Sequence, residues 1–553
     1  MHFWHRMTSR LGALPAKRVT WGLVLTFSVW VVLDVFIFKL TGGVAQSSFD
    51  AMVRNRVVVA APDPRIVIID IDEASLARMG KEFGRWPWPR DTLATVLEHI
   101  ERQAPVAVAW DLVFSDADRM SPGGDAAFNE AAARSLHSHF PVVRLPQAND
   151  SASQITRAAL PGLWLAPGPG AQTRQTAGKA STVALIAPAL PAVASGRLGY
   201  NNGYVDTDGV LRRYRYLEPL ADGSAIQSLP LSILSAINPV AHHAHLTGAT
   251  GTIDSKNELI AWRRAPDAYP RIAFADVFAQ AEGGKPLTPV PPFTGKVVII
   301  GATAPSLHDI HPTPLSAMQA GVDSMATVID NALNQRHLRE PPRWLQAALA
   351  IGLCAGLALW VQFKSAASLA PALLALPAAL LAISFLSLNG LPWFIDLHLA
   401  AGLALVFLAA LRFWSTLRRI HWCTPALNTP QALAIWPWER SDAWLEAPLD
   451  RLIDALERHA PDCRIVIPDT NVTWPNTLRW PELARCMAVV GPHDALVAAR
   501  AKLEPSLMRL AVRSGELLLL DLPTNRERLA TAVCSAWSNL QNSNTPPNER
   551  RTK

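Results

Sequence analysis

The chain of 553 residues places one apolar segment before residue 42 and three more apolar segments after residue 342. Each segment is long enough to cross the hydrocarbon core of a bilayer, which takes about 20 residues of α-helix. The sequence between the first and second segments, and the sequence after the last, must therefore form domains outside the bilayer. This one-plus-three arrangement is typical of proteins that carry information across a membrane.

The apolar segments divide the chain into consecutive regions. These are a cytoplasmic N-terminal segment (1–18), a first membrane helix (19–41), an outer domain (42–342), three membrane helices (343–362, 368–388 and 393–412), a cytoplasmic domain (413–540) and a disordered tail (541–553). A cleaved signal peptide is the alternative for the first segment, because Gly43-Val44-Ala45 resembles a cleavage site. The apolar stretch is too long for a signal peptide and contains Asp34, which favours an uncleaved anchor.

Cations beside the apolar segments indicate the orientation, because such cations stay in the cytoplasm. Four precede the first segment and three follow the last: Arg6, Arg10, Lys17, Arg18, Arg412, Arg418 and Arg419. Both termini are therefore predicted to be cytoplasmic, with the outer domain on the opposite side. Arg336, Arg339 and Arg343 conflict with this rule, but they end a long domain, where the rule has least force.

The outer domain contains three β-branched, apolar runs that predict strands buried on both faces of a sheet. The runs cover residues 66–72, 106–114 and 296–303. Helical patterns at 73–80 and 91–101 separate the first two runs, so the domain is predicted to be α/β with a mostly parallel sheet. The cytoplasmic domain shows a similar alternation and is predicted to be a small α/β domain. Val205 to Pro219 predicts a hairpin that turns at Asp208-Gly209, in preference to a calcium loop.

Cysteine usage and charge exclude several classes of partner. None of the five cysteines lies in the outer domain, so disulfides do not hold it, and no CxxC pair suggests zinc. The net charge of +6 comes largely from the membrane flanks and the tail, so no nucleic-acid partner is expected. No cofactor is expected.

Acidic residues follow the predicted strands of the outer domain. Asp72 and Glu73 end the first strand, Asp111 ends the second, and Asp309 follows the third between His308 and His311. Ligands bind outside the carboxyl ends of strands in open parallel sheets, so these groups could converge on a divalent cation or an amine-bearing ligand. The alternative is local: Asp72 caps the following helix and Asp111 holds a turn.

The segment Trp86-Pro87-Trp88-Pro89-Arg90 is stiffened by two prolines. Its two indoles could line a pocket, with Arg90 meeting an anionic group. The alternative is that Trp86 and Trp88 fill the domain core while Arg90 begins the next helix.

These motifs together resemble the CHASE-type-two extracellular sensor domain family. The resemblance rests on residues 69–73, 86–90, 110–114, 203–213 and 298–304, and continues at Asp309, Thr313-Pro314 and Gly321-Val322. It implies a ligand-sensing domain with one preceding and three following membrane helices, usually joined to a cytoplasmic enzyme. One departure occurs at Asp323-Ser324-Met325-Ala326, where Met325 stands in the place that the family usually gives to His.

No catalytic motif is recognisable in the cytoplasmic domain or elsewhere, so we expect a receptor and not an enzyme. A receiver-like site at Asp469 and Asp521, which follow predicted strands, is the alternative for the cytoplasmic domain. We expect a bacterial inner-membrane sensor that binds an extracytoplasmic small molecule, signals to a cytoplasmic protein and forms a homodimer. A metal-dependent envelope enzyme and a structural or assembly protein are the alternative functions.

Overall fold

The computed structural model describes residues 11–165, 182–220, 224–247, 257–363, 369–423, 432–437, 446–466, 486–508 and 518–521, with residues 528, 531, 534 and 535. Asp469 and the predicted tail 541–553 lie outside the described residues. The chain divides into two compact units. We call Gly42–Pro341 together with Ile383–Asp396 the α/β unit, and the remainder the membrane unit.

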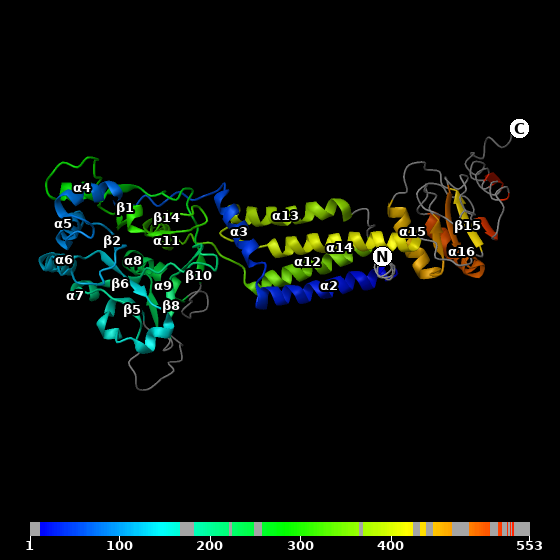
Figure 1. The fold of residues 1–553 in the computed structure, drawn as a ribbon, viewed down its shortest axis with the longest axis horizontal. Helices are drawn as coiled ribbons and strands as arrows, with labels where there is room; N and C mark the ends of the chain where they lie inside the picture. The colour runs from blue at the N-terminus through cyan, green and yellow to red at the C-terminus, as the bar shows by residue number, and fades with distance from the viewer. Residues whose placement is uncertain are drawn as a thin grey trace. The chain divides into compact units, whose positions relative to one another are not determined.

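Parallel strands form the centre of the α/β unit, as the apolar runs predicted (Figure 1). Their order is β11 (Arg271–Ala273), β1 (Ile66–Ile71), β12 (Val297–Ala302), β2 (Ala107–Trp110), β3 (Ser138–Arg144) and β6 (Arg197–Tyr200). The short strand β5 (Leu185–Ile186) pairs with β3 in the antiparallel direction. Ile66 of β1 lies opposite Val297 of β12, and Val297 lies opposite Ala107 of β2, so the three central strands start in register.

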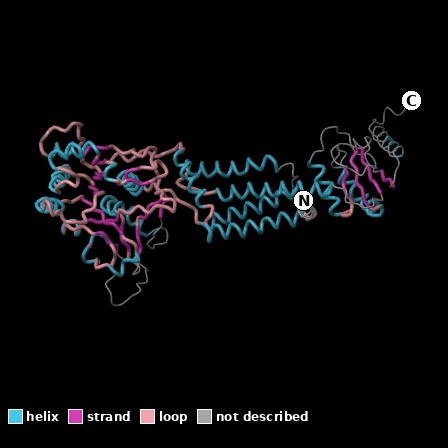
Figure 2. Tube along the Cα trace, in the orientation of Figure 1, coloured by secondary structure: helices cyan, strands magenta, loops and turns pink. Residues whose placement is uncertain are grey.

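Helices cover both faces of this sheet (Figure 2). On one face α4 (Glu73–Phe83), α5 (Arg90–Glu101) and α10 (Phe274–Ala281) pack against Val67, Ile69 and Ile71 of β1. On the other face α8 (Leu229–Ile237) and α11 (Gly321–Asn334) pack against Ile66 and Ile68. Side chains alternate between the faces of a strand, so one apolar run serves both layers.

Shorter elements complete the α/β unit. They are α3 (Gly42–Arg54), α6 (Pro122–Arg134), α7 (Pro191–Ala194), α9 (Pro239–Thr247), β4 (Trp164–Leu165), β7 (Arg213–Arg215), β8 (Leu217–Pro219), β9 (Ala225–Gln227), β10 (Asn257–Leu259), β13 (Ile310–His311) and β14 (Gln319–Ala320). The predicted hairpin over 205–219 is wrong, although the turn at Asp208-Gly209 forms. β7 pairs with the distant strand β10, and β8 pairs with β9, the next strand along the chain, so neither pairs with the segment before the turn.

The described residues contain four helices long and apolar enough to cross a membrane, which confirms the one-plus-three layout. α2 (Ala16–Leu33) continues as a π-helical segment (Asp34–Phe38) and packs against α12 (Arg343–Phe363). α13 (Leu369–Gly390) and α14 (His398–Cys423) follow. The last helix begins five residues later than residue 393, where the sequence predicted it, because Trp393 forms a β-bridge with Arg339 and the Phe394 N–H donates to the Arg339 carbonyl.

Asp34 is buried at the end of the first of these helices. Its carboxylate accepts hydrogen bonds from the backbone of Leu40, at 2.8 Å, and from the backbone and hydroxyl of Thr41. This intramembrane acid therefore terminates its own helix.

The described C-terminal residues form a four-stranded antiparallel sheet with helices α15 (Glu446–His459) and α16 (His493–Met508). The strand order is β16 (Arg464–Val466), β17 (Cys486–Gly491), β15 (Ala432–Pro437) and β18 (Leu518–Asp521). Strands and helices combine here as predicted, but β15 was not predicted.

Candidate functional site

A cavity of about 310 Å³ lies at the carboxyl ends of β2 and β12, beside the first half of α11. This is the edge at which open parallel sheets bind ligands. The lining residues come from four stretches of the chain: Trp86; Asp111, Leu112 and Val113; Asn201, Gly203, Leu211 and Tyr214; and Ala302, Leu307, Asp309, His311, Gly321, Ser324, Met325 and Val328.

Two glycines allow the walls of the cavity to approach each other. A Cβ atom on Gly301, near the end of β12, would lie 2.7 Å from Val322 Cγ2. A Cβ atom on Gly321 would overlap the Asp309 carboxylate. Such contacts are too short for any side chain, so glycine at both positions sets how closely α11 meets the sheet and Asp309.

The polar end of the cavity is formed by Asp111, Asp309, His311 and Asn201. The Asn201 amide donates to Asp111 Oδ1 at 3.4 Å, and His311 Nε2 lies 3.5 Å from Asp309 Oδ1. Burial, followed by the negative charge of Asp309, raises the pKa of Asp111 to about 7. Hydrogen bonding to Asp309 raises the pKa of His311 above its usual value.

Trp86 and Tyr214 contribute aromatic surface to the same cavity. The Tyr214 hydroxyl donates to the Tyr200 carbonyl at 3.5 Å, a long hydrogen bond. The Ser324 hydroxyl is buried in the cavity wall and has no hydrogen-bond partner in the part of the chain that the structure describes. A buried hydroxyl without a partner is costly, so a ligand that bonds to it would be favoured.

The sequence-predicted residues separate into two groups. Trp86, Asp111 and Asp309 come together at the cavity, whereas four others do not line it: Asp72, Glu73, Trp88 and Arg90. Asp72 is the N-cap of α4 and accepts from the Ser75 backbone N–H at 2.7 Å. Its role is therefore the local one that the sequence offered as the alternative.

The other three residues outside the cavity have structural contacts as well. Glu73 accepts from the backbone N–H of Ser306 at 3.1 Å. Trp88 is buried in the core, with its ring centroid 5.3 Å from that of Phe274. Arg90 begins α5 and pairs with Asp125 of α6 at 2.5 Å. This ion pair joins the two helices, and Arg90 does not line the cavity.

The comparison with protein families decides the affiliation of the chain. A family model described as the CHASE2 domain matches residues 24–361, which is more than half of the sequence. The chain belongs to the CHASE2 domain family. CHASE2 is a sensor domain, and with its four apolar helices this chain is a multi-pass membrane protein. No curated protein and no solved structure matches it.

The departure from the CHASE2 pattern falls in the cavity wall. Met325, the position at which the resemblance led us to expect His, lines the cavity, and the imidazole in the lining comes from His311. Asp323 points elsewhere and pairs with Arg271 at 2.6 Å. Among the described residues, no group of three or more His, Cys, Asp or Glu side chains is placed to hold a metal ion.

The sequence did not single out Asn201, Tyr214 or Ser324 as cavity residues. Asn201 follows β6, and Tyr214 lies in β7, which pairs with β10. Ser324 lies in the first turn of α11. Only the order of the strands in the sheet brings these positions together, so no local pattern could have identified them.

Replacing Asp111 with asparagine is expected to change how the stability of the α/β unit depends on pH. The raised pKa of Asp111 means that the folded state favours the protonated acid, so this stabilisation is lost as pH rises towards about 7. Between pH 5 and 8 the wild type should lose roughly 2.6 kcal/mol relative to Asp111→Asn. Urea unfolding of the full chain in micelles, followed by pulse proteolysis, measures the difference. Parallel pH profiles for the two proteins would contradict the assignment.

Proposed function

We propose that this CHASE2 protein is a transmembrane receptor, and not an enzyme. Its α/β unit binds a small extracytoplasmic ligand in the cavity, and the membrane helices pass the change to the C-terminal domain. Both termini are cytoplasmic, the membrane is the bacterial inner membrane, and the C-terminal domain acts on another signalling protein. A homodimer is the expected assembly.

The position of α11 carries this proposal. The first half of the helix lines the cavity with Gly321, Ser324, Met325 and Val328. The helix ends at Asn334, and α12, an apolar helix long enough to span a membrane, begins at Arg343. A ligand that favours one position of α11 therefore acts on the segment that leads directly into the membrane.

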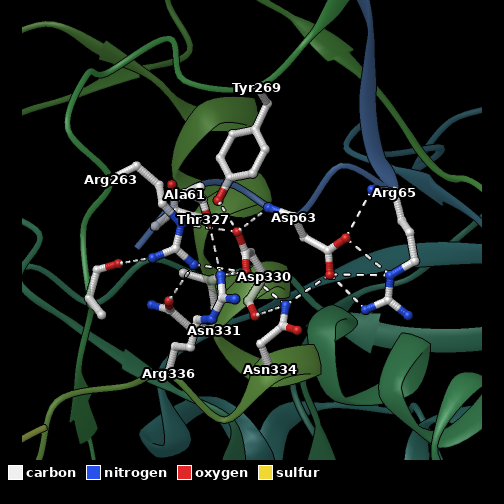
Figure 3. A network of polar contacts seen from close by, with 12 residues as sticks. Ala61, Asp63, Arg65, Arg263, Tyr269, Thr327, Asp330, Asn331, Asn334 and Arg336 are labelled. Carbon is white, nitrogen blue, oxygen red and sulfur yellow. Dashed lines mark hydrogen bonds and ion pairs between the residues drawn. The ribbon is translucent and has the colours of Figure 1, made fainter. Parts of the chain in front are cut away.

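The second half of α11 is fixed by a buried polar network (Figure 3). Asp330 accepts from the backbone of Asp63 at 3.0 Å and from Tyr269 at 2.9 Å, and pairs with Arg263 at 2.8 Å. The Asn334 amide donates to both Asp330 and Asp63. Asp63 lies between α3 and β1, so α11 is linked to the chain that follows the first membrane helix.

A second group of charged residues lies beside the two segments that lead to membrane helices, namely α3 after the first helix and the residues just before α12. Arg212 forms a bidentate pair with Asp50 of α3, with distances of 2.8 and 2.7 Å, and also meets Asp206 and Asp208. The neighbouring Arg213 pairs with Glu340, three residues before α12, at 2.7 Å. Bidentate pairs of this kind fix geometry as well as adding energy, which suits an element that transmits movement.

Within the membrane unit, the end of α14 is joined to α15 of the C-terminal domain. Arg419 forms a bidentate pair with Asp450, both distances being 2.9 Å. Arg418 meets Asp454 at 2.8 Å and also pairs with Glu457. Movement of α14 would therefore displace α15 through these ion pairs.

Filling the cavity is expected to change the C-terminal domain if this proposal is correct. Leu112→Trp places a large side chain in the cavity wall, whereas Leu136→Trp makes the same change at an exposed position. Hydrogen exchange of the full chain in nanodiscs should show altered protection of α15 in the first variant only. A tenfold change in the protection factor of α15 corresponds to about 1.4 kcal/mol in its opening free energy. Altered exchange in α11 without any change in α15 would refute transmission.

A further inference from the structure

We propose that the cavity takes an organic ammonium ion, meaning a small molecule with a protonated amine on an apolar body. This inference rests on the proposed function, because it names the ligand class of the same cavity. The amine lies between Asp111 and Asp309, and the apolar body lies against Trp86 and Tyr214.

The charges in the wall exclude an anionic ligand. Asp111 and Asp309 are the acids, and the lining contains neither lysine nor arginine. The one basic group, His311, already lies 3.5 Å from Asp309. A carboxylate or phosphate group would lose its hydration beside two acids without gaining a strong cationic partner, which costs several kcal/mol.

Asp111 has no arginine partner among the described residues, unlike Asp125 and Asp323 in the same unit. Within the described part of the chain its side chain accepts one hydrogen bond, the 3.4 Å contact from Asn201. Asp125 and Asp323 meet arginines at 2.5 and 2.6 Å. An ionised carboxylate can accept about four hydrogen bonds, so Asp111 retains acceptor capacity directed at the cavity.

Ser324 provides a second, independent indication of a ligand. The residue is 5 % exposed and lies in the cavity wall. Its hydroxyl has no hydrogen-bond partner among the described residues. An ammonium group has three donors, which matches two carboxylates and one hydroxyl oxygen. One bound ammonium group would therefore supply hydrogen bonds both to the Ser324 hydroxyl and to the Asp111 carboxylate.

The remainder of the wall selects an organic body over a bare metal ion. Leu112, Leu211, Met325 and Val328 are apolar, and Trp86 and Tyr214 present aromatic rings. A divalent cation such as Ca²⁺ takes six to eight oxygen ligands, which this surface does not supply. Aromatic rings attract a nearby cation through their π faces, and they also bury apolar groups. They therefore suit an amine attached to a hydrocarbon body.

Three probes that share a phenyl body test the charge requirement: 2-phenylethylamine, 2-phenylethanol and 3-phenylpropanoate. Binding to the full chain in nanodiscs is measured by calorimetry, with Mg²⁺ and Ca²⁺ as further probes. We expect the amine to bind at least about tenfold more tightly than the alcohol, and the anion not to bind. Asp111→Asn and Asp309→Asn should each weaken amine binding by about tenfold or more. Glu73→Gln, which alters a strand-end acid outside the cavity, should leave it unchanged.

The outcomes separate this inference from the proposed function. Preferential binding of the alcohol, the anion or a metal ion, abolished by Leu112→Trp, would overturn the amine class while retaining a receptor. Failure of every probe to bind would also overturn it, provided that hydrogen exchange shows the α/β unit folded. Unchanged amine binding in both Asp111→Asn and Asp309→Asn would show that the amine lies elsewhere. The receptor itself is tested by the response of α15 to Leu112→Trp, which needs no ligand.

Discussion

Replacing Asp330 with alanine is expected to lower the free energy of unfolding of the α/β unit by about 4 kcal/mol. Asp330 is fully buried in the middle of α11, and its partner Arg263 is 2 % exposed. The substitution leaves the guanidinium of Arg263, the hydroxyl of Tyr269 and the backbone N–H of Asp63 without their shared acceptor (Figure 3). An uncompensated buried charge accounts for most of the loss.

Urea unfolding of the full chain, read by pulse proteolysis, measures this loss. Glu130→Ala provides the control, because Glu130 forms an exposed pair with Arg134 and should change stability by less than about 0.5 kcal/mol. The double variant Arg263→Met/Asp330→Leu should recover part of the stability, since apolar side chains can replace a buried ion pair. Equal losses for Asp330→Ala and Glu130→Ala would show that the network does not hold α11.

The three central strands of the sheet were predictable because they carry their signal locally, whereas strands β3, β5, β6 and β11 were not predicted. Ile66 to Ile71 is apolar at successive positions, and the structure buries both faces of this strand against different helices. The helix over 91–101 was equally clear, because Leu93, Val96, Leu97 and Ile100 share one face and are all buried. Membrane helices were predictable for the same reason, since length and apolar composition suffice.

The cavity was only partly predictable, because strand order is a non-local property. β12 lies between β1 and β2 in the sheet, although it comes far later in the chain. Of the acids expected to meet at these strand ends, Asp111 and Asp309 line the cavity, whereas Asp72 caps a helix. Whether a strand-end acid caps a helix or faces a cavity depends on the side of the sheet to which it points. Asp111 falls on the side that α11 covers.

The Asp330 network could not have been predicted from any motif. Its members come from residues 63, 263, 269, 330 and 334, and each is unremarkable in its own segment. The available signal was a row of polar residues at helical spacing, Asp323, Thr327, Asp330 and Asn334, on a helix whose other positions are largely apolar. Its partners depend on how α11 is placed against residues 61–65 and 263–269.

Acidification from pH 7 to pH 4 is expected to destabilise the α/β unit by about 3 kcal/mol through His139 alone. His139 lies in β3, is fully buried, and has a pKa lowered to about 3 by burial and then by the positive charge of Arg197. One ring nitrogen, Nδ1, lies 2.9 Å from the Ser232 hydroxyl of α8, while Nε2 has no partner among the described residues. The folded state therefore retains the neutral ring.

The sign follows from the difference between the folded and unfolded states. Unfolded histidine takes up a proton below its usual pKa of about 6.5, whereas folded His139 does so only near 3, so acid favours unfolding throughout this interval. His139→Asn should be less stable at pH 7 but should lose about 3 kcal/mol less on acidification. His137→Asn, at a partly exposed position paired with Glu101, should not remove this loss. An unchanged pH slope in His139→Asn would mean that the ring is charged or solvated in the folded protein. In that case the packing of α8 on β3, which excludes water from this side of the sheet, would have to be looser than the structure shows.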